Sequence, residues 1–306
     1  MRCIRCRATA QVEVRRHRSA FCARCYPGWF RTQVQRSIDE GPMFVRDERV
    51  LVAVSGGKDS LALWHALIKL GYLADGMYIR LGIGDYSRRS QAKAEAFADK
   101  HGQLLHQVDL QAEYGFTVPQ LRDARRGKPC AACGTVKRYQ FNRIASDLGY
   151  DVVATGHNLD DEAATLLGNV IHWQVDFLGR QGPVLDSTHA RLKRKVKPLY
   201  RLGEREAAAY AVIERIDYIL EECPMARGAK SLLYKDALNA LEEAQPGAKY
   251  RFLTGFLSKG REAVAVPQEN VVLRECARCG QATTAEVCAF CRLVERRRRK
   301  AEATPA

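Results

Sequence analysis

The central part of the chain alternates between short apolar runs and longer segments in which apolar residues recur every three or four positions. The apolar runs predict buried strands at residues 49–54, 75–81, 103–110 and 151–157. The other segments predict helices at residues 61–71, 87–102 and 134–149, and from residue 159 onward. Strands that alternate with helices of this length form a parallel sheet. We therefore expect an α/β fold, with helices on both faces of the sheet.

Cysteine clusters lie at both ends of the chain, and the segment beyond Pro198 is mostly helical. Helices are predicted there at residues 203–214, 229–244 and 248–260. In chain order, the expected domains are an N-terminal four-cysteine module (1–27), the α/β domain (28–200), a helical extension that carries Cys223 (201–260), a linker (261–275), a C-terminal four-cysteine module (276–293) and a basic, disordered tail (294–306). For the charge run Arg296–Lys300 within that tail, a solvated helix end is the alternative.

The composition narrows the class of protein. Among 306 residues, 49 are basic and 35 acidic, which gives a net charge of +14. This surplus favours a polyanionic partner such as nucleic acid, with a merely soluble basic surface as the alternative. No apolar run approaches the roughly 18–20 residues that span a bilayer. The start of the chain is basic and cysteine-bearing, unlike a secretion signal, so the eleven cysteines predict metal ligands in a reducing compartment.

The segment Ser55-Gly56-Gly57-Lys58-Asp59-Ser60 stands between a predicted strand and a predicted helix. Glycines let the backbone approach a ligand closely, and a helix N-terminus offers N–H donors to an anion. The segment is not a Walker A loop, because that motif needs a further glycine ahead of the Gly-Lys pair. We interpret it as a phosphate-binding loop; a strand–helix turn capped by serine and aspartate is the alternative.

A second segment, Gly156–Glu162 (GHNLDDE), follows the predicted strand 151–157 in the same way. Both segments leave the carboxyl ends of strands, where open α/β sheets bind ligands. Asp161 is our candidate for an acidic residue at a reaction centre, as proton acceptor or magnesium ligand. The alternative is that Asp160 and Asp161 only cap the helix.

The two segments SGGKDS and GHNLDDEA resemble the motifs of the N-type ATP pyrophosphatases, which have a Rossmann-like fold and cleave ATP between its α and β phosphates. The resemblance implies that the loop holds the β and γ phosphates and that Asp59 helps to hold magnesium. Lys58 would bind phosphate or only neutralise nearby charge. The nucleotide-binding residues implied are Ala53, Ser55, Gly57, Asp59, Ser60, Ile79, Lys137, Gly156 and Asp161.

Three further cysteines lie in the middle of the chain: Cys130 and Cys133 form a CxxC ahead of a helix, and Cys223 stands alone. Such a set suits a redox pair, an incomplete zinc site, buried thiols, or a [4Fe–4S] cluster with one open iron. If the helix begins at the CxxC, Lys137 shares a face with both thiols and points toward the nucleotide. An ordinary surface lysine is the alternative.

Each terminal module contains two CxxC pairs, a spacing typical of a closed four-thiolate zinc site. The ligands are Cys3, Cys6, Cys22 and Cys25 in the first module and Cys276, Cys279, Cys288 and Cys291 in the second. Two more iron–sulfur clusters are the alternative. The arginines of the first module, followed by Tyr26 and Trp29, suit phosphate binding and stacking on unpaired bases, unless the modules only cap the domain. The basic segment 191–195 is either an RNA contact near the active-site mouth or a mobile loop.

The whole set of motifs resembles the TtuA-type tRNA 2-thiouridine synthetases of the TtcA/TtuA family, within the PP-loop superfamily. This resemblance implies a [4Fe–4S] cluster on Cys130, Cys133 and Cys223, and Lys137 with Asp161 as catalytic residues. It also implies two Zn²⁺, ATP with Mg²⁺, a tRNA substrate, a ubiquitin-like thiocarboxylated sulfur-carrier protein, a homodimer and a cytoplasmic location. We expect 2-thiolation of the T-loop uridine. Wobble-uridine or cytidine thiolation, or a zinc-knuckle RNA-binding protein with an inert ATP fold, are the alternatives.

Overall fold

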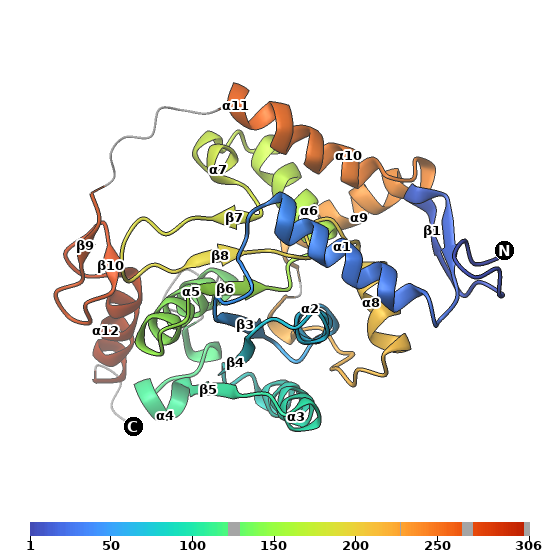
Figure 1. Cartoon of the computed structure of the whole chain (residues 1–306). Helices are drawn as coiled ribbons and strands as arrows, with labels where there is room; N and C mark the ends of the chain where they lie inside the picture. The colour runs from blue at the N-terminus through green and yellow to red at the C-terminus, as the bar shows by residue number, and fades with distance from the viewer. Residues whose placement is uncertain (122–128, 227, 265–271, 303–306) are drawn as a thin grey trace.

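A six-stranded sheet lies at the centre of the molecule, and its strand order is β5-β4-β3-β6-β8-β7 in the computed structural model (Figure 1). The strands are β3 (Val50–Val54), β4 (Ala74–Arg80), β5 (Leu105–Asp109), β6 (Val152–Thr155), β7 (Val184–Leu185) and β8 (Arg194–Val196). All neighbouring pairs are parallel except β7 and β8. The expected parallel α/β sheet is therefore confirmed. The structure describes residues 1–121, 129–226, 228–264 and 272–302.

Helices cover both faces of this sheet, which explains why β3 is apolar throughout. Alternate side chains of a strand point to opposite faces, and Val52 and Leu51 pack in two different hydrophobic cores. The core around Val52 contains α2 (Lys58–Lys69) and α3 (Gly84–His101), with α1 (Tyr26–Glu40) and α8 (Glu204–Ile213) packed against α2. The core around Leu51 contains α5 (Pro129–Asp147).

A further group of helices forms a second, mostly helical part above the sheet in Figure 1. They are α6 (Leu159–Ile171), α7 (Val175–Arg180), α9 (Lys230–Ala244), α10 (Ala248–Gly255), the π-helical turn η4 (Phe256–Gly260) and α11 (Arg261–Ala263). The short helix α4 (Leu110–Tyr114) lies apart from them, beside β5. α9 and α10 pack against α6. The predicted helices in this part are confirmed, and the predicted linker begins in α11, with residues 265–271 outside the described residues.

The two four-cysteine modules lie at opposite ends of the molecule (Figure 1). The first contains the hairpin of β1 (Val12–Val14) and β2 (Ser19–Phe21), joined by the short helix η1 (Arg15–His17). Arg16 of this module forms an ion pair with Glu206 of α8, 2.9 Å long and largely buried. Tyr26 and Trp29 are only 0% and 7% exposed. Because their rings fill the joint between the module and α1, the expectation that they stack on RNA bases is wrong.

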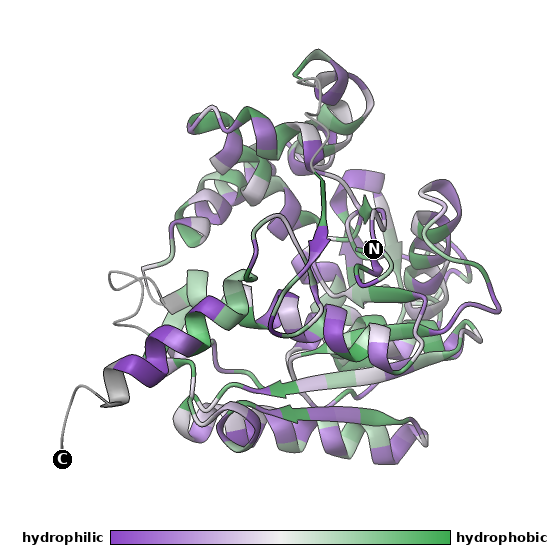
Figure 2. Cartoon of the chain, turned by 90° about the vertical axis from the view of Figure 1, so that its left-hand side faces the viewer, coloured by the Kyte–Doolittle hydropathy of each residue, from purple (hydrophilic) through white to green (hydrophobic). Residues whose placement is uncertain are grey.

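The second module contains β9 (Arg274–Glu275), β10 (Ala282–Thr283) and the helix α12 (Ala289–Glu302). The expected disordered tail is wrong for residues 294–302, and residues 303–306 lie outside the described residues. Phe290 and Leu293 are buried and anchor the start of α12, so the run Arg296–Lys300 continues a helix that is already formed. Figure 2 shows the helix apolar at its start and hydrophilic where it projects toward the C-terminus.

Replacing Phe290 with alanine should loosen the second module from α5. Phe290 is 3% exposed, and its ring stacks on Tyr139 of α5 with the centroids 3.8 Å apart. Removal of a buried phenylalanine side chain costs about 3–5 kcal/mol. We expect a lower midpoint of thermal unfolding and faster proteolytic release of the C-terminal segment. Phe177→Ala is the matched control, because Phe177 is 57% exposed and its loss should change stability by less than about 0.5 kcal/mol. Equal midpoints for both variants would contradict this role of Phe290.

The basic segment 191–195 lies at the end of the sheet where the parallel strands begin, that is, at their amino ends. Arg194 is in register with Val152, the first residue of the parallel strand β6. Its guanidinium group pairs with Glu48, which precedes β3, over 3.2 Å. The predicted nucleotide loops follow the other ends of β3 and β6. The expected RNA contact near the active-site mouth is therefore wrong in its position.

Candidate active site

The segment Ser55–Ser60 forms a tight loop between β3 and α2. The hydroxyl oxygens of Ser55 and Ser60 lie 3.2 Å apart, and the Ser60 hydroxyl donates to the carbonyl oxygen of Gly57 over 3.0 Å. Among the described residues, no side chain caps α2, so the simple capped turn is not what the structure contains. The first backbone N–H groups of α2 remain available to an anion.

Gly56 sits where this loop touches α3. Its φ angle is +74°, and a Cβ atom at this position would lie 2.2 Å from the carbonyl oxygen of Ser90. A left-handed backbone and so close a neighbour together require glycine. Gly56 thus fixes the distance between the loop and α3.

The second predicted loop, Gly156–Glu162, packs directly on the first. A Cβ atom on Gly156 would lie 2.8 Å from the backbone nitrogen of Ser60. Asn158 caps α6 and donates its side-chain N–H to Asp59 over 3.2 Å. The chain runs outward from β3 to β4 and β5 and then returns to β6 on the other side of β3. The two loops therefore meet at the switch point where α/β sheets bind ligands.

Asp160 and Asp161 have different surroundings. Asp160 is buried, pairs with Lys249, and accepts the backbone N–H of Glu204 over 2.8 Å. One oxygen of Asp161 accepts the backbone N–H of Asn158 over 3.1 Å. Asp161 therefore does cap the helix, as the alternative interpretation predicted. The other oxygen of Asp161 lies at the charged centre of the site, and Asp160 has a structural role.

Two charged residues of this centre, Glu204 and Lys235, are missing from the sequence prediction. The ammonium nitrogen of Lys58 lies 3.1 Å from Asp59 and 2.7 Å from Glu204. The ammonium nitrogen of Lys235 lies 2.6 Å from Asp161 and 3.4 Å from Glu204. Glu204 opens α8 and Lys235 lies in α9, both outside the two motifs. Glu204 stands near a predicted helix start and Lys235 stands inside a predicted helix, and neither position tells where the helix packs.

The charges at this centre affect one another. Burial raises the pKa of Asp59; the ammonium group of Lys58 opposes this rise, and the charges of Asp161 and Glu204 add to it. Burial also acts to raise the pKa of Glu204, but Lys58 and Lys235 outweigh it and the pKa is lowered. Carboxylates that disfavour one another's charge favour a bound cation. Oxygen ligands of this kind suit Mg²⁺, so Asp59 and Asp161 fit the predicted ion.

Ala53 and Ile79, also predicted to bind the nucleotide, lie near the same edge of the sheet. Each is the last residue but one of its strand, in β3 and β4 respectively. Ile79 is 7% exposed, and Ala53 is half-buried. Their contact with a nucleotide stays a prediction.

Cys130, Cys133 and Lys137 lie in the first turns of α5, as their spacing predicted. Burial raises the pKa of the Cys133 thiol, the charge of Lys137 opposes this rise, and the charges of Cys223 and Cys130 add to it. These four groups are therefore near enough to influence one another electrostatically. The helix brings the two thiols and the lysine to one place, and the chain around Cys223 joins them.

Two hydrogen bonds tie the chain around Cys223 to the rest of the site. The backbone N–H of Ile219 donates to the carbonyl oxygen of Gly56 over 2.9 Å. Beyond Cys223, in the short helix η3 (Pro224–Ala226), the carbonyl oxygen of Met225 accepts from the Cys130 thiol over 3.4 Å. The segment thus connects the phosphate loop with the CxxC, and Cys223 lies between these two contacts along the chain.

The number of central thiols distinguishes between two kinds of metal centre. Cys130, Cys133 and Cys223 offer three thiolates. A structural zinc ion takes four protein ligands, whereas a [4Fe–4S] cluster binds each thiolate to a different iron. The three thiolates therefore fit such a cluster better than a closed zinc site.

The terminal modules each bring four cysteine sulfur atoms within 4.8 Å of one another. The members are Cys3, Cys6, Cys22 and Cys25, and Cys276, Cys279, Cys288 and Cys291. The sulfurs of Cys6 and Cys22 are 3.5 Å apart, and those of Cys279 and Cys288 are 3.8 Å apart. Tetrahedral zinc bound at about 2.3 Å to each sulfur needs a sulfur–sulfur distance of about 3.8 Å. Both groups fit a structural zinc ion.

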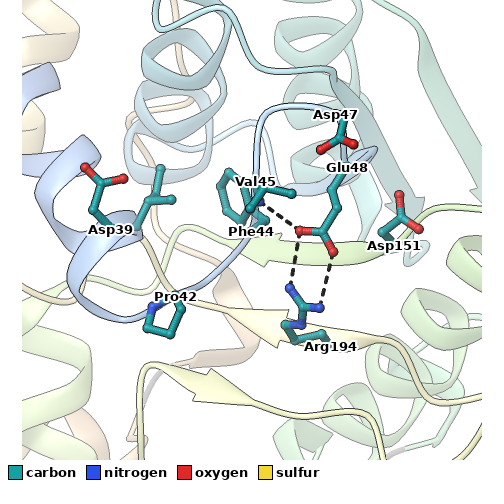
Figure 3. A pocket seen from close by; sticks show the side chains of 9 residues that line it. Asp39, Pro42, Phe44, Val45, Asp47, Glu48, Asp151 and Arg194 are labelled. Carbon is teal, nitrogen blue, oxygen red and sulfur yellow. Dashed lines mark hydrogen bonds and ion pairs between the residues drawn. The ribbon is translucent and has the colours of Figure 1, made fainter.

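A pocket of about 720 Å³ lies at the amino ends of the strands, away from the two nucleotide loops (Figure 3). Figure 3 shows Glu48 and Arg194 paired within it, at the starts of β3 and β8. A second pocket of about 390 Å³ is lined by Tyr86, Glu222 and Pro224. Because Glu222 and Pro224 flank Cys223, only the second pocket belongs to the candidate active site.

Residues 30–225 match a family model described as a PP-loop domain. Over its whole length, the chain is 52% identical to a tRNA-5-methyluridine(54) 2-sulfurtransferase of Thermus thermophilus, and the match covers 95% of that protein. It is 42% identical to a Thermotoga maritima protein of the same name, with both chains fully covered.

Among solved structures, the U34-tRNA thiolase NcsA from Methanococcus maripaludis, with its [4Fe–4S] cluster, superposes with a TM-score of 0.81. The identity is 24%, and the match covers 97% of this chain and 96% of that one. This likeness shows a shared fold. No helix among the described residues combines the length and apolar character needed to cross a membrane.

Proposed function

The chain belongs to the PP-loop family of tRNA 2-sulfurtransferases. We therefore propose that it uses ATP to replace the carbonyl oxygen at C2 of the tRNA T-loop uridine (the atom O2) with sulfur. The target is 5-methyluridine at position 54, as in the named relatives. ATP is cleaved to AMP and pyrophosphate. The cytoplasm, where tRNA is found, is the proposed location.

One observation carries this proposal. The N–H group of Ile219 is bonded to the carbonyl oxygen of Gly56 over 2.9 Å, four residues before Cys223. This bond supports a single site that contains a loop suited to ATP and three thiols suited to a sulfur-bearing centre. Activation of the uridine and delivery of sulfur can both occur there without movement of the base between separate sites.

The chemistry needs ATP because the oxygen at C2 of uracil is a poor leaving group. O2 attacks the α phosphorus, the bond to the bridging β-phosphate oxygen breaks, and pyrophosphate leaves. O2 is then part of an adenylate. Sulfide adds at C2 as the nucleophile, the C2–O2 bond breaks, and the O2 atom leaves with AMP. Each step exchanges one bond for another, so no oxidant is needed.

The residues of the two loops act on the phosphates. Ser55, Gly57 and Ser60 hold the β and γ phosphates at the start of α2, where N–H donors stabilise charge that develops on the departing pyrophosphate. Magnesium held by Asp59 and Asp161 would polarise the phosphoryl oxygens. Lys137, half-buried beside Cys133, neutralises charge at the α phosphate.

The three central cysteines supply the sulfur end of the site. Cys130, Cys133 and Cys223 would hold a [4Fe–4S] cluster, which would supply sulfide for the transfer. The pocket beside Cys223, lined by Tyr86, has room for a uracil ring. Burial and the nearby charge of Cys223 raise the pKa of the Tyr86 hydroxyl to about 12, so this hydroxyl keeps its proton and can donate a hydrogen bond there.

The partners follow from the family and from charge. The net charge of +14 supports tRNA as the substrate. The two zinc modules stabilise the ends of the chain and offer arginines to the tRNA backbone. A ubiquitin-like carrier with a C-terminal thiocarboxylate as sulfur donor, and a homodimer, stay predictions.

The choice of position 54 over the wobble uridine rests on identity. The two relatives named for position 54 are 52% and 42% identical to this chain, whereas the U34 thiolase is 24% identical. Both motif segments are complete, which speaks against an inert ATP fold. A cytidine target has no observation in its favour.

The test is an anaerobic assay with purified protein, ATP, Mg²⁺, sulfide and tRNA that lacks thiolation. We expect one thionucleoside, 2-thio-5-methyluridine, at position 54 by mass spectrometry, together with pyrophosphate and AMP in equal amounts. A tRNA with cytidine at position 54 is the control and should gain no sulfur. A thionucleoside at position 34 would contradict the proposed target, and thiolation without pyrophosphate would contradict the proposed chemistry.

A further inference from the structure

Three helices begin next to one another at the candidate active site. The carboxylate of Asp160, in the first turn of α6, accepts the backbone N–H of Glu204 at the start of α8 over 2.8 Å. Asn158, at the start of α6, donates to Asp59 of α2 over 3.2 Å. Each helix N-terminus carries a partial positive charge of about half an elementary charge. Three such ends in one place favour a ligand with several negative charges, such as a polyphosphate.

Two lysines flank Glu204 at this point. Lys58 lies 2.7 Å from one oxygen of Glu204, and Lys235 lies 3.4 Å from the other. Each lysine also contacts one aspartate: Lys58 contacts Asp59 over 3.1 Å, and Lys235 contacts Asp161 over 2.6 Å. Both oxygens of Glu204 are therefore occupied by ammonium groups, and the carboxylate holds the two lysines on either side of itself.

The hydrogen-bond capacity of the lysines exceeds these contacts. An ammonium group has three N–H donors, and each lysine uses two of them on the carboxylates just named. One donor of Lys58 and one of Lys235 thus remain for a ligand. The two side chains are 23% and 22% exposed, so both ammonium groups are accessible.

The ion pair of Lys235 with Asp161 is not needed to hold α9 against α6. The apolar side chains of Leu238, Ala163 and Ala164 are buried together between these helices. The side chains of Lys235 and Asp161 are 22% and 28% exposed, so a ligand can reach the pair from solvent. The position of Lys235 therefore suits ligand binding.

From this arrangement, we propose that Lys235 and Lys58 both bind the polyphosphate of ATP. Glu204 contacts both lysines and holds them in position for this binding. The proposal rests on the use of ATP in the proposed function and adds a residue from the helical extension to the nucleotide site. It also gives a role to the contacts of α9, which lies beyond the matched PP-loop domain, with the starts of α6 and α8.

The test compares Lys235→Met, Lys235→Arg and Glu204→Gln with Lys259→Met, a control at an exposed lysine of η4. A non-hydrolysable ATP analogue with Mg²⁺, and separately AMP, are titrated into each protein by calorimetry, without tRNA. Loss of a charge-assisted hydrogen bond should weaken binding of the ATP analogue by about tenfold or more in Lys235→Met. AMP should bind as in the unaltered protein, because it lacks the β and γ phosphates.

The other variants separate charge from structure. Lys235→Arg keeps the charge and should restore most of the affinity, and Glu204→Gln should weaken the analogue but not AMP. Equal binding of the analogue by Lys235→Met and Lys259→Met would overturn the proposal, and so would equal losses for the analogue and AMP. If thiolation fails in the tRNA assay, the titration can still test whether Lys235 binds the polyphosphate. If the unaltered protein binds no ATP analogue, both proposals are overturned.

Discussion

A protein in which alanine replaces Gly56 is expected to lose at least about a hundredfold in tRNA-dependent pyrophosphate release, because displacing reacting groups by about 1 Å can cost that much. The backbone at Gly56 has φ +74°, and the added methyl group would lie 2.2 Å from the carbonyl oxygen of Ser90. The left-handed backbone alone costs roughly 1–2 kcal/mol for alanine. Since both contacting groups are backbone, the loop must move away from α3, and its N–H donors move with it.

Gly102→Ala is the matched control for this variant. Gly102 also has a positive φ angle, +61°, but an added Cβ would meet nothing within 4 Å. This variant should lose stability and keep its rate of pyrophosphate release. Both proteins are compared by thermal unfolding and by the single-turnover rate with saturating ATP. A rate for Gly56→Ala equal to that of Gly102→Ala would show that the close contact with Ser90 does not set the loop.

Replacing Cys130, Cys133 or Cys223 individually with alanine is expected to abolish thiolation and to leave binding of the ATP analogue within about twofold. Each thiol is proposed to hold a separate iron, and a cluster with only two protein ligands is poorly retained. The nucleotide loops touch this part of the chain through the backbone bond between Ile219 and Gly56, which does not involve a thiol. Binding of ATP and transfer of sulfur should therefore separate.

Cys279→Ala is the control for these three variants. Cys279 belongs to the C-terminal four-sulfur group, so its loss should remove one zinc ion and no iron. Anaerobic analysis of the unaltered protein should give about four irons and two zinc ions per chain, from one cluster and two four-thiolate sites. Undiminished thiolation by Cys133→Ala would exclude the proposed route of sulfur.

The phosphate loop and the terminal modules were predictable because their information is local. The run VLVAV followed by SGGKDS predicts a buried strand, a tight turn and a helix start within a dozen residues. The same holds for the paired CxxC spacing, which leads directly to the two groups of four sulfurs. The face shared by Cys130, Cys133 and Lys137 follows from the period of one helix.

The parts that the sequence could not predict depend on packing between distant segments. Glu204 and Lys235 reach the site only because α8 packs on α2 and α9 packs on α6. Tyr26 and Trp29 are amphipathic, and their positions in the sequence do not tell whether they face RNA or a core. The segment 191–195 was misplaced because β8 is only three residues long, too short to show a pattern that would reveal its direction.

The ion pair between Arg16 and Glu206 affects how far a tRNA bound to the N-terminal module would lie from the candidate active site. Glu206 accepts the backbone N–H of Gly203 over 2.9 Å, directly ahead of the glutamate that contacts Lys58. The N-terminal module is thus packed against α8, the helix that begins with Glu204 at the candidate active site. If a tRNA binds the arginines of this module, as proposed above, it lies at a distance from the candidate active site that the packing of the module on α8 sets.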